Sequence, residues 1–175
     1  MGAKWSFVFL IVTLQSHASA VELVLSSDGV GPINKSSLFN KAKIQGQLPK
    51  WEIKEVGVLG AGGHPYNLLA VFDGKTKVLE ILPDEGNKAV LKVIVLSNKI
   101  KNSFGPQIGS LFGSVFKEPP KACEPYFEDD ETDSTVCAAP QSKYVRYIFG
   151  GKWGRDIPYE VLRSYKLTSM FWLAP

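Results

Sequence analysis

The stretch "FGPQIGSLFGSVF", Phe104 to Phe116, decides the expected fold, because "VGPINKSSLFNKA", Val30 to Ala42, nearly repeats it. Both run from Gly-Pro through an Ile to Ser-Leu-Phe. In each copy a Ser hydroxyl can accept a hydrogen bond from a free backbone N–H and so begin a helix. Each copy also follows a strand-like run. The repeat therefore predicts a structural joint, used twice, at which a strand leads into a helix.

Two helices are expected at these joints. The first is expected over residues 38–48, after Ser36 and Ser37, and the second over residues 111–116, after Ser110. Prolines follow both segments and would end the helices, because proline lacks the backbone N–H that a helix needs. The Leu-Phe pairs of the two copies should then fill matching buried places.

Strand-like runs make up most of the remaining chain, separated by turn signals such as Asp73-Gly74 and Asp84-Glu85-Gly86. The runs are residues 21–27, 51–59, 67–74, 75–86, 88–97, 144–149 and 166–173. This order predicts an α+β fold with two pseudo-repeated strand–helix–meander lobes and mainly antiparallel sheet. One compact domain, residues 21–175, would consist of half-repeats at about 21–87 and 88–175.

The first residues have the pattern of a secretory signal peptide. Lys4 gives a positive start, residues 7–14 are apolar, and Ala18-Ser19-Ala20 is a small-residue cleavage site. Cleavage after Ala20 is expected. The alternatives are an uncleaved anchor or a buried first helix, but the apolar run is shorter than the about 20 residues that span a bilayer. No later segment is long and apolar enough for a transmembrane helix, so a periplasmic or secreted protein is expected.

The charge of the expected mature chain is nearly balanced. Without Lys4, 19 basic and 17 acidic residues remain, and the basic residues are scattered along the chain. A nucleic-acid-binding domain normally concentrates positive charge on one surface. The composition therefore argues against nucleic acid as a partner.

The two cysteines, Cys123 and Cys137, are expected to form a disulfide, because an even number of cysteines in an exported protein is typical of disulfide pairing. The alternative is a metal site with two thiolate ligands. Zinc would need two more Cys or His ligands, and the expected mature chain has one histidine, His64. No metal or cofactor is therefore expected.

No assembled catalytic motif is present. The Gly-rich stretch from Gly57 to Tyr66 lacks the following helix of a dinucleotide-binding loop, so a hairpin connection is expected there. His64 is the single histidine available as a base, and both cysteines are assigned to the disulfide. No catalytic residues are therefore assigned, and no enzyme is expected.

Two segments are candidates for binding. The acidic loop from Glu128 to Ser134 could bind Ca²⁺ through oxygen ligands, but it lacks the spacing and the glycine of an EF-hand, and a solvated loop is the simpler interpretation. Trp153 and Arg155 lie near a turn and could face a partner, since Trp and Arg are favoured at interfaces. The alternative for Trp153 is packing beneath its own loop.

Four segments together resemble the RpoE-regulated lipoproteins, a family of bacterial envelope proteins. They are "GVGPINKSSLFN", "QIGSLFGSVF", "CEPYFEDDETDSTVCAAPQSKYVRYIFGGKWG" and "VLRSYKLTSMFW". The most specific part contains Cys123, Cys137, Ser142, Phe149 and Trp153. The resemblance implies a Gram-negative envelope location, an α+β fold and no assigned activity. One departure is that Ala20-Val21 stands where the family has a lipidated cysteine, which favours a soluble periplasmic protein.

A non-catalytic module that binds an envelope protein or component, linked to envelope stress, is the function expected from these observations. Two alternatives stay open. One is a small-ligand or Ca²⁺ binder that uses Glu128 to Asp133, and the other is an envelope hydrolase with carboxylates that the sequence does not pair.

Overall fold

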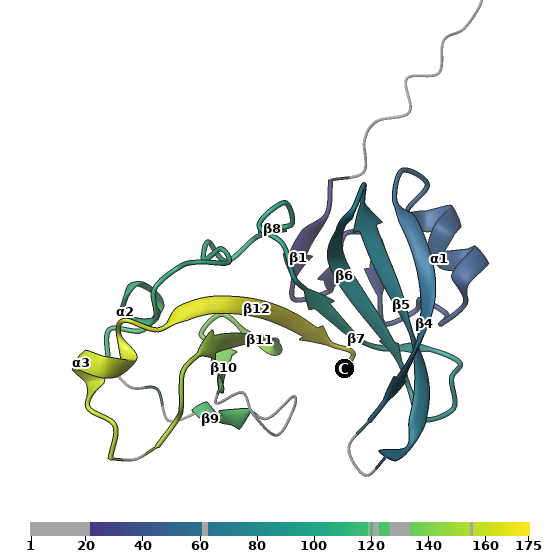
Figure 1. Ribbon diagram of the computed structural model, residues 1–175. Helices are drawn as coiled ribbons and strands as arrows, with labels where there is room; N and C mark the ends of the chain where they lie inside the picture. Colours follow the sequence, from purple (N-terminus) through teal and green to yellow (C-terminus); the bar gives the residue numbers. More distant parts are fainter. Residues whose placement is uncertain (1–21, 61–62, 119, 121–122, 127–133, 155) are drawn as a thin grey trace, which may run out of the picture.

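The computed structural model describes residues 22–60, 63–118, 120, 123–126, 134–154 and 156–175. Its main feature is a strongly twisted eight-stranded sheet, in which every neighbouring pair is antiparallel (Figure 1). In spatial order its strands are β4 (Glu52–Leu59), β5 (Pro65–Asp73), β6 (Thr76–Pro83), β7 (Val90–Val95), β12 (Lys166–Leu173), β11 (Ser142–Gly150), β10 (Ser134–Ala139) and β9 (Cys123–Tyr126). The expected cleavage site at Ala20 lies outside the described residues.

A second, small sheet joins the start of the described chain to its middle. Its strands, in spatial order, are β3 (Ile33–Asn34), β2 (Gly29–Val30), β1 (Val24–Ser26) and β8 (Lys101–Asn102). Strand β1 pairs with β8 in parallel, with Leu25 opposite Asn102. Gly29 permits the tight turn after β1, because its φ of 148° is unfavourable for other residues and a Cβ there would meet the Ile33 carbonyl oxygen at 1.9 Å.

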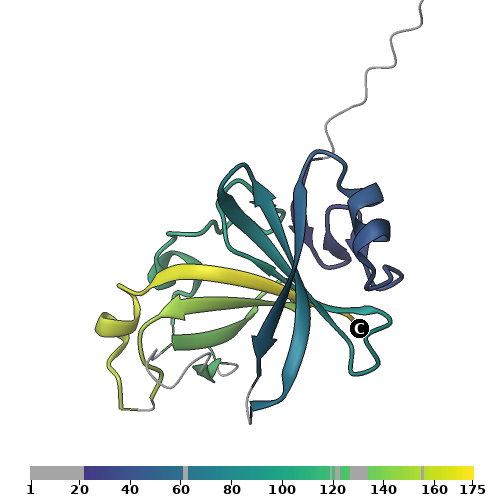
Figure 2. The same cartoon turned by 45° about the vertical axis from the view of Figure 1, so that its right-hand side comes forward.

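The predicted α+β class is wrong, because the described chain is mainly β. Its three helices are short: α1 (Lys41–Gln47), α2 (Phe112–Val115) and α3 (Tyr159–Leu162). Figure 2 shows the twist of the large sheet, with α1 beside β4. The chain therefore has strand meanders where strand–helix lobes were expected.

The Ser residues of the repeated phrase explain the short helices. The Ser37 and Ser110 hydroxyl oxygens accept hydrogen bonds from backbone N–H groups three residues earlier, at 3.0 and 2.9 Å. They therefore close turns before the Leu-Phe pair and do not cap a helix after it. The first helix begins later, at Lys41, where the Asn40 side chain accepts from the Lys43 N–H at 3.1 Å.

The two Ser-Leu-Phe segments nevertheless make matching contacts. Each forms an isolated antiparallel bridge at the start of a central strand, the first with Ala89, directly before β7, and the second with Lys166 of β12. The four bonds are Phe39 N to Lys88 O (2.9 Å), Val90 N to Ser37 O (3.0 Å), Phe112 N to Tyr165 O (2.8 Å) and Leu167 N to Ser110 O (2.8 Å). The expected burial differs, because Leu38 and Leu111 are both exposed, Phe39 is half-buried and Phe112 is fully buried.

The strand order divides the large sheet into two meanders, which correspond to the two expected half-repeats. Strands β4 to β7 form one meander, β9 to β12 form another, and the last strands of the two meanders pair with each other. A division after β7 fits this arrangement better than one at residue 87. The duplication itself stays a prediction.

Both faces of the large sheet carry apolar contacts. On one face, Trp172, Tyr147, Phe112 and Phe149 belong to the main core, which extends to Ile44 of α1. On the other face, a smaller cluster consists of Ile94, Val136, Ile148 and Phe171. The central strands β7, β11 and β12 are therefore apolar on both sides, which explains their continuous runs of Val, Ile and aromatic residues.

A buried amide connects the small sheet to the large one. The Asn102 side chain donates to the Pro106 carbonyl at 2.8 Å and to the Tyr147 hydroxyl at 3.1 Å, and it accepts from the Phe104 N–H at 3.1 Å. Burial raises the pKa of Tyr147, and the bond from Asn102 acts in the opposite direction. The Asn102 amide thus fixes the second Gly-Pro joint to the large sheet. The repeated phrase alone does not predict this contact, because Tyr147 is distant in the sequence.

Candidate functional site

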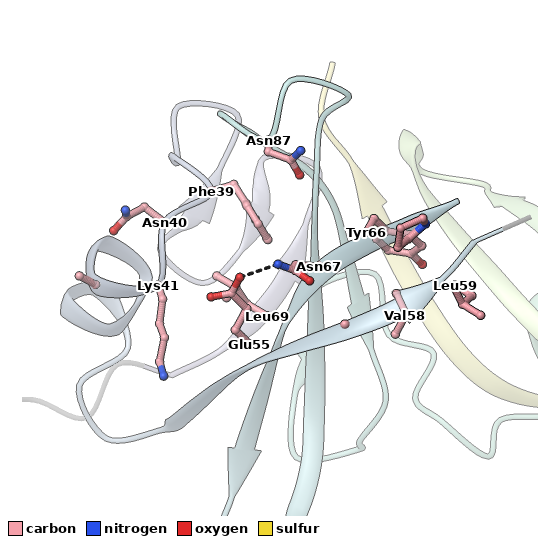
Figure 3. A pocket seen from close by; sticks show the side chains of 13 residues that line it. Phe39, Asn40, Lys41, Glu55, Val58, Leu59, Tyr66, Asn67, Leu69 and Asn87 are labelled. Atoms are coloured by element: carbon pink, nitrogen blue, oxygen red, sulfur yellow. Dashed lines mark hydrogen bonds between the residues drawn. The ribbon is translucent and has the colours of Figure 1, made fainter. Parts of the chain in front are cut away.

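A groove of about 700 Å³ lies at the free end of the β4–β5 hairpin (Figure 3). Its walls are the first turn of α1, the outer part of the hairpin, and the turn that connects β6 to β7. The lining residues are Phe39, Asn40, Lys41, Ala42, Glu55, Gly57, Val58, Leu59, Pro65, Tyr66, Asn67, Leu69 and Asn87.

The first Ser-Leu-Phe segment holds two walls of this groove together. Phe39 donates its N–H to the Lys88 carbonyl at 2.9 Å, which fixes the segment to the β6–β7 turn. The Asn40 cap then directs α1 over the beginning of β4. The repeated phrase therefore builds the groove in the first half of the chain, although sequence reasoning gave it only a structural role.

The β6–β7 turn is ordered by the carboxylate of Asp84. One oxygen accepts hydrogen bonds from the Lys88 N–H at 2.7 Å and from the Ala89 N–H at 3.2 Å. These bonds, that of Lys88 first, lower the pKa of Asp84 below its ordinary value. They also stabilise the turn in which Asn87 adopts a φ of 55° and faces the groove.

We expect Asp84→Asn to weaken the acid dependence of stability. A lowered carboxyl pKa stabilises the folded state above the unfolded pKa of about 3.9, and this contribution is lost as the pH falls through the folded pKa. Urea unfolding of the wild type should therefore show a steeper loss of stability below about pH 4 than the variant. Glu85→Gln removes an exposed carboxylate from the same turn and is the matched control. Equal acid limbs in wild type and Asp84→Asn would contradict the assignment.

The hairpin wall combines an apolar base with polar groups. Leu69 is buried at the base, and Glu55 and Asn67 stand on neighbouring strands above it. The Asn67 amide donates to a Glu55 carboxylate oxygen at 2.8 Å, as Figure 3 shows. Glu55 is the one carboxylate among the described lining residues, and it shares the groove with the amides of Asn40, Asn67 and Asn87 and with Lys41. This arrangement can hydrogen-bond a ligand, and no second carboxylate accompanies Glu55 among the described lining residues.

The residues singled out by sequence lie elsewhere. His64 is exposed in the β4–β5 connection and does not line the groove. Trp153 is half-buried and packs against the main core. Arg155 and the acidic segment from Glu128 to Asp133 lie outside the described residues. Within the described ranges, no three His, Cys, Asp or Glu side chains gather closely enough to hold a metal ion.

Sequence reasoning missed Glu55 and Asn67. Both lie in runs that it assigned correctly to strands, and the run from Trp51 to Leu59 contains alternating polar residues. Such alternation indicates a face turned away from a core, but it does not indicate which strands are neighbours. The 12-residue separation between Glu55 and Asn67 is bridged only by the register of the hairpin.

A family described as "Protein of unknown function (DUF1131)" matches residues 4–174. The chain belongs to this family. The crystal structure of the uncharacterized protein yfeY from Escherichia coli is similar to the family member described here, with a TM-score of 0.68 and 20% sequence identity. The match covers 87% of this chain and 99% of that chain, and it shows a shared fold. No curated protein matches the sequence. Membership in the family supplies no activity, and the resemblance to RpoE-regulated lipoproteins stays a prediction.

Proposed function

We propose that the protein is a non-catalytic binding module of the bacterial envelope, and that the groove beside β4 and β5 receives an envelope protein or component. The observation that carries the proposal is the groove itself, with a buried apolar base and several hydrogen-bonding side chains around it. A concave site with an apolar lining and a few oriented polar groups is typical of binding sites.

Three features support an envelope location. The first 20 residues have a signal-peptide pattern, a disulfide joins Cys123 to Cys137, and the sequence resembles RpoE-regulated lipoproteins, which links the protein to envelope stress. Among the described residues, no helix has the length and apolarity needed to cross a membrane.

Binding is favoured over hydrolysis by the chemistry of the groove. A hydrolase that relies on carboxylates needs two of them at a defined separation, one as acid and the other as base or nucleophile. The described lining residues include the single carboxylate of Glu55, which already accepts a hydrogen bond from Asn67.

Site-specific crosslinking in intact host cells tests the proposal. A photoreactive amino acid replaces Ala42, which lines the groove, and in a matched protein it replaces Lys75, which is exposed in the β5–β6 turn. We expect a discrete adduct from position 42 and none from position 75. The charge reversal Glu55→Lys should weaken the adduct, and His64→Ala should leave it unchanged.

Two results would count against the binding module. One is the absence of an adduct from position 42 in cells that contain the folded protein. The other is turnover of an envelope substrate by the purified protein together with loss of that activity in His64→Ala. Mass spectrometry of the adduct identifies the partner.

A further inference from the structure

The two edges of the large sheet differ in a way that points to a binding mode. At one edge, β9 has four residues, contains Pro125 and is tied to its neighbour by the Cys123–Cys137 disulfide. At the other edge, β4 has eight residues and no proline, and it pairs with β5 along its whole length without a register shift. Proline, short length and bulges are the usual means of blocking an edge, and β4 has none of them.

The backbone groups that β4 turns outward follow from its register. Gly60 N–H donates to the His64 carbonyl at 2.9 Å, in line with the β4–β5 register, so hydrogen-bonded pairs alternate back from this position. Leu59 then lies in a non-bonded pair with Pro65, which has no N–H to donate. The N–H and C=O groups of Glu55, Gly57 and Leu59 therefore point away from β5. Within the described part of the chain, no bond to another segment uses their N–H groups.

The charged side chains of β4 do not shield these groups. Lys54 pairs with Glu52 at 3.2 Å and lies over the Phe72 ring of β5, 4.9 Å from its centroid. Glu55 is held by Asn67, also from β5. Gly57 has no side chain, and a Cβ at that position would contact Asn67 alone, at 3.6 Å. The outer half of β4 therefore presents an open hydrogen-bonding edge beside the groove.

We propose that β4 binds an extended segment of a partner protein as an added strand. The inference rests on the proposed function and specifies its ligand. Main-chain bonds to Glu55, Gly57 and Leu59 would supply affinity, and alternate side chains of the segment would enter the groove, which supplies selectivity. A Lys or Arg opposite Glu55 completes the contact, because opposite charges on adjacent strands attract and the described ion pairs do not include Glu55.

A second copy of the chain fits this edge less well. Two β4 strands related by a twofold axis can pair their outward-facing groups over most of their length in two registers, centred on Glu55 or on Val56. The first register places the two Glu55 carboxylates opposite each other, and the second places them on the diagonal. Like charges at these positions are unfavourable.

Hydrogen exchange measured by NMR distinguishes an added strand from other binding. Peptides of about ten residues, long enough to span β4, are selected from a random phage-displayed library on the full chain. In the free protein, the Lys54, Val56 and Val58 amides should exchange slowly and the Glu55, Gly57 and Leu59 amides quickly. The selected peptide should slow exchange at the second set.

Two substitutions at one position provide the matched pair. Gly57→Pro removes the outward N–H and leaves the β4–β5 bonds intact, and Gly57→Ala adds a side chain but keeps the N–H. We expect the peptide Kd to rise about tenfold or more for Pro and less than about twofold for Ala. Thermal unfolding and the exchange pattern of free Gly57→Pro establish that it is folded.

Each other outcome overturns the added strand. If a selected peptide binds while the Glu55, Gly57 and Leu59 amides stay unprotected, the groove binds its ligand without strand addition, and the proposed function stands. If no peptide is selected but the adduct from position 42 forms, strand addition is likewise excluded and the proposed function stands. If these amides are already protected in a free protein that sediments as a dimer, a second copy occupies the edge. If neither peptide nor adduct is found, both proposals fail.

Discussion

Phe112→Ala is expected to lower the free energy of unfolding by about 4 kcal/mol, because it removes a fully buried aromatic ring from the main core. The ring centroid lies 5.0 Å from that of Phe116 and 4.9 Å from that of Phe149, and Tyr159 is at 6.5 Å. These contacts join α2 and α3 to β11, so the resulting cavity would loosen the whole end of the second half. Urea unfolding followed by tryptophan fluorescence measures the change.

Phe39→Ala is the matched control, because Phe39 has the same place in the other copy of the Ser-Leu-Phe phrase. Phe39 is half-buried beside the groove, so its loss should cost about 1–2 kcal/mol. Equal losses of stability from the two substitutions would contradict the difference in burial between Phe39 and Phe112.

Reducing the disulfide is expected to lower the free energy of unfolding by about 3 kcal/mol, since the Cys123–Cys137 link closes a loop with a sequence separation of 14 residues. The two cysteines are directly opposite each other on β9 and β10, and Cys137 is fully buried. The structure thus confirms the pairing that the sequence predicted. Unfolding with and without dithiothreitol gives the difference.

The double variant Cys123→Ala/Cys137→Ala serves as the control, because dithiothreitol should not change its stability. Thiol labelling of denatured, unreduced wild type should find no free thiol in protein from the native envelope. Two labelled thiols per chain, or an unchanged stability on reduction, would contradict a structural disulfide.

Local patterns predicted most of the long strands, but the predicted runs do not include β9 and β10. Alternation and β-branched composition predicted strands at residues 51–59 and 166–173, and β4 and β12 are found there. The turn at Asp73-Gly74 was also predicted, and Gly74 has the φ of 61° that favours glycine. These features depend on neighbours in sequence, so they can be read from it. The disulfide could be predicted for a similar reason, since the chain contains only two cysteines.

The helices were overestimated because two local interactions competed for the same Ser residues. A Ser before an apolar run can cap a helix or close a turn behind itself, and Ser37 and Ser110 do the second. The choice is made by β7 and β12, which bond the backbone of the Ser-Leu-Phe segments in extended form. No property of the phrase itself indicates these distant strands.

The sequence by itself therefore determined most of the long strands, the turns between them and which cysteines can pair. The tertiary structure alone decided that the chain is mainly β, that β4 is a free edge and that Glu55 meets Asn67 in a groove beneath α1. The physical reason is that a strand's period shows which side chains share a face, whereas the neighbour of each strand is set by packing over the whole sheet. An open edge and a groove are properties of that neighbour order.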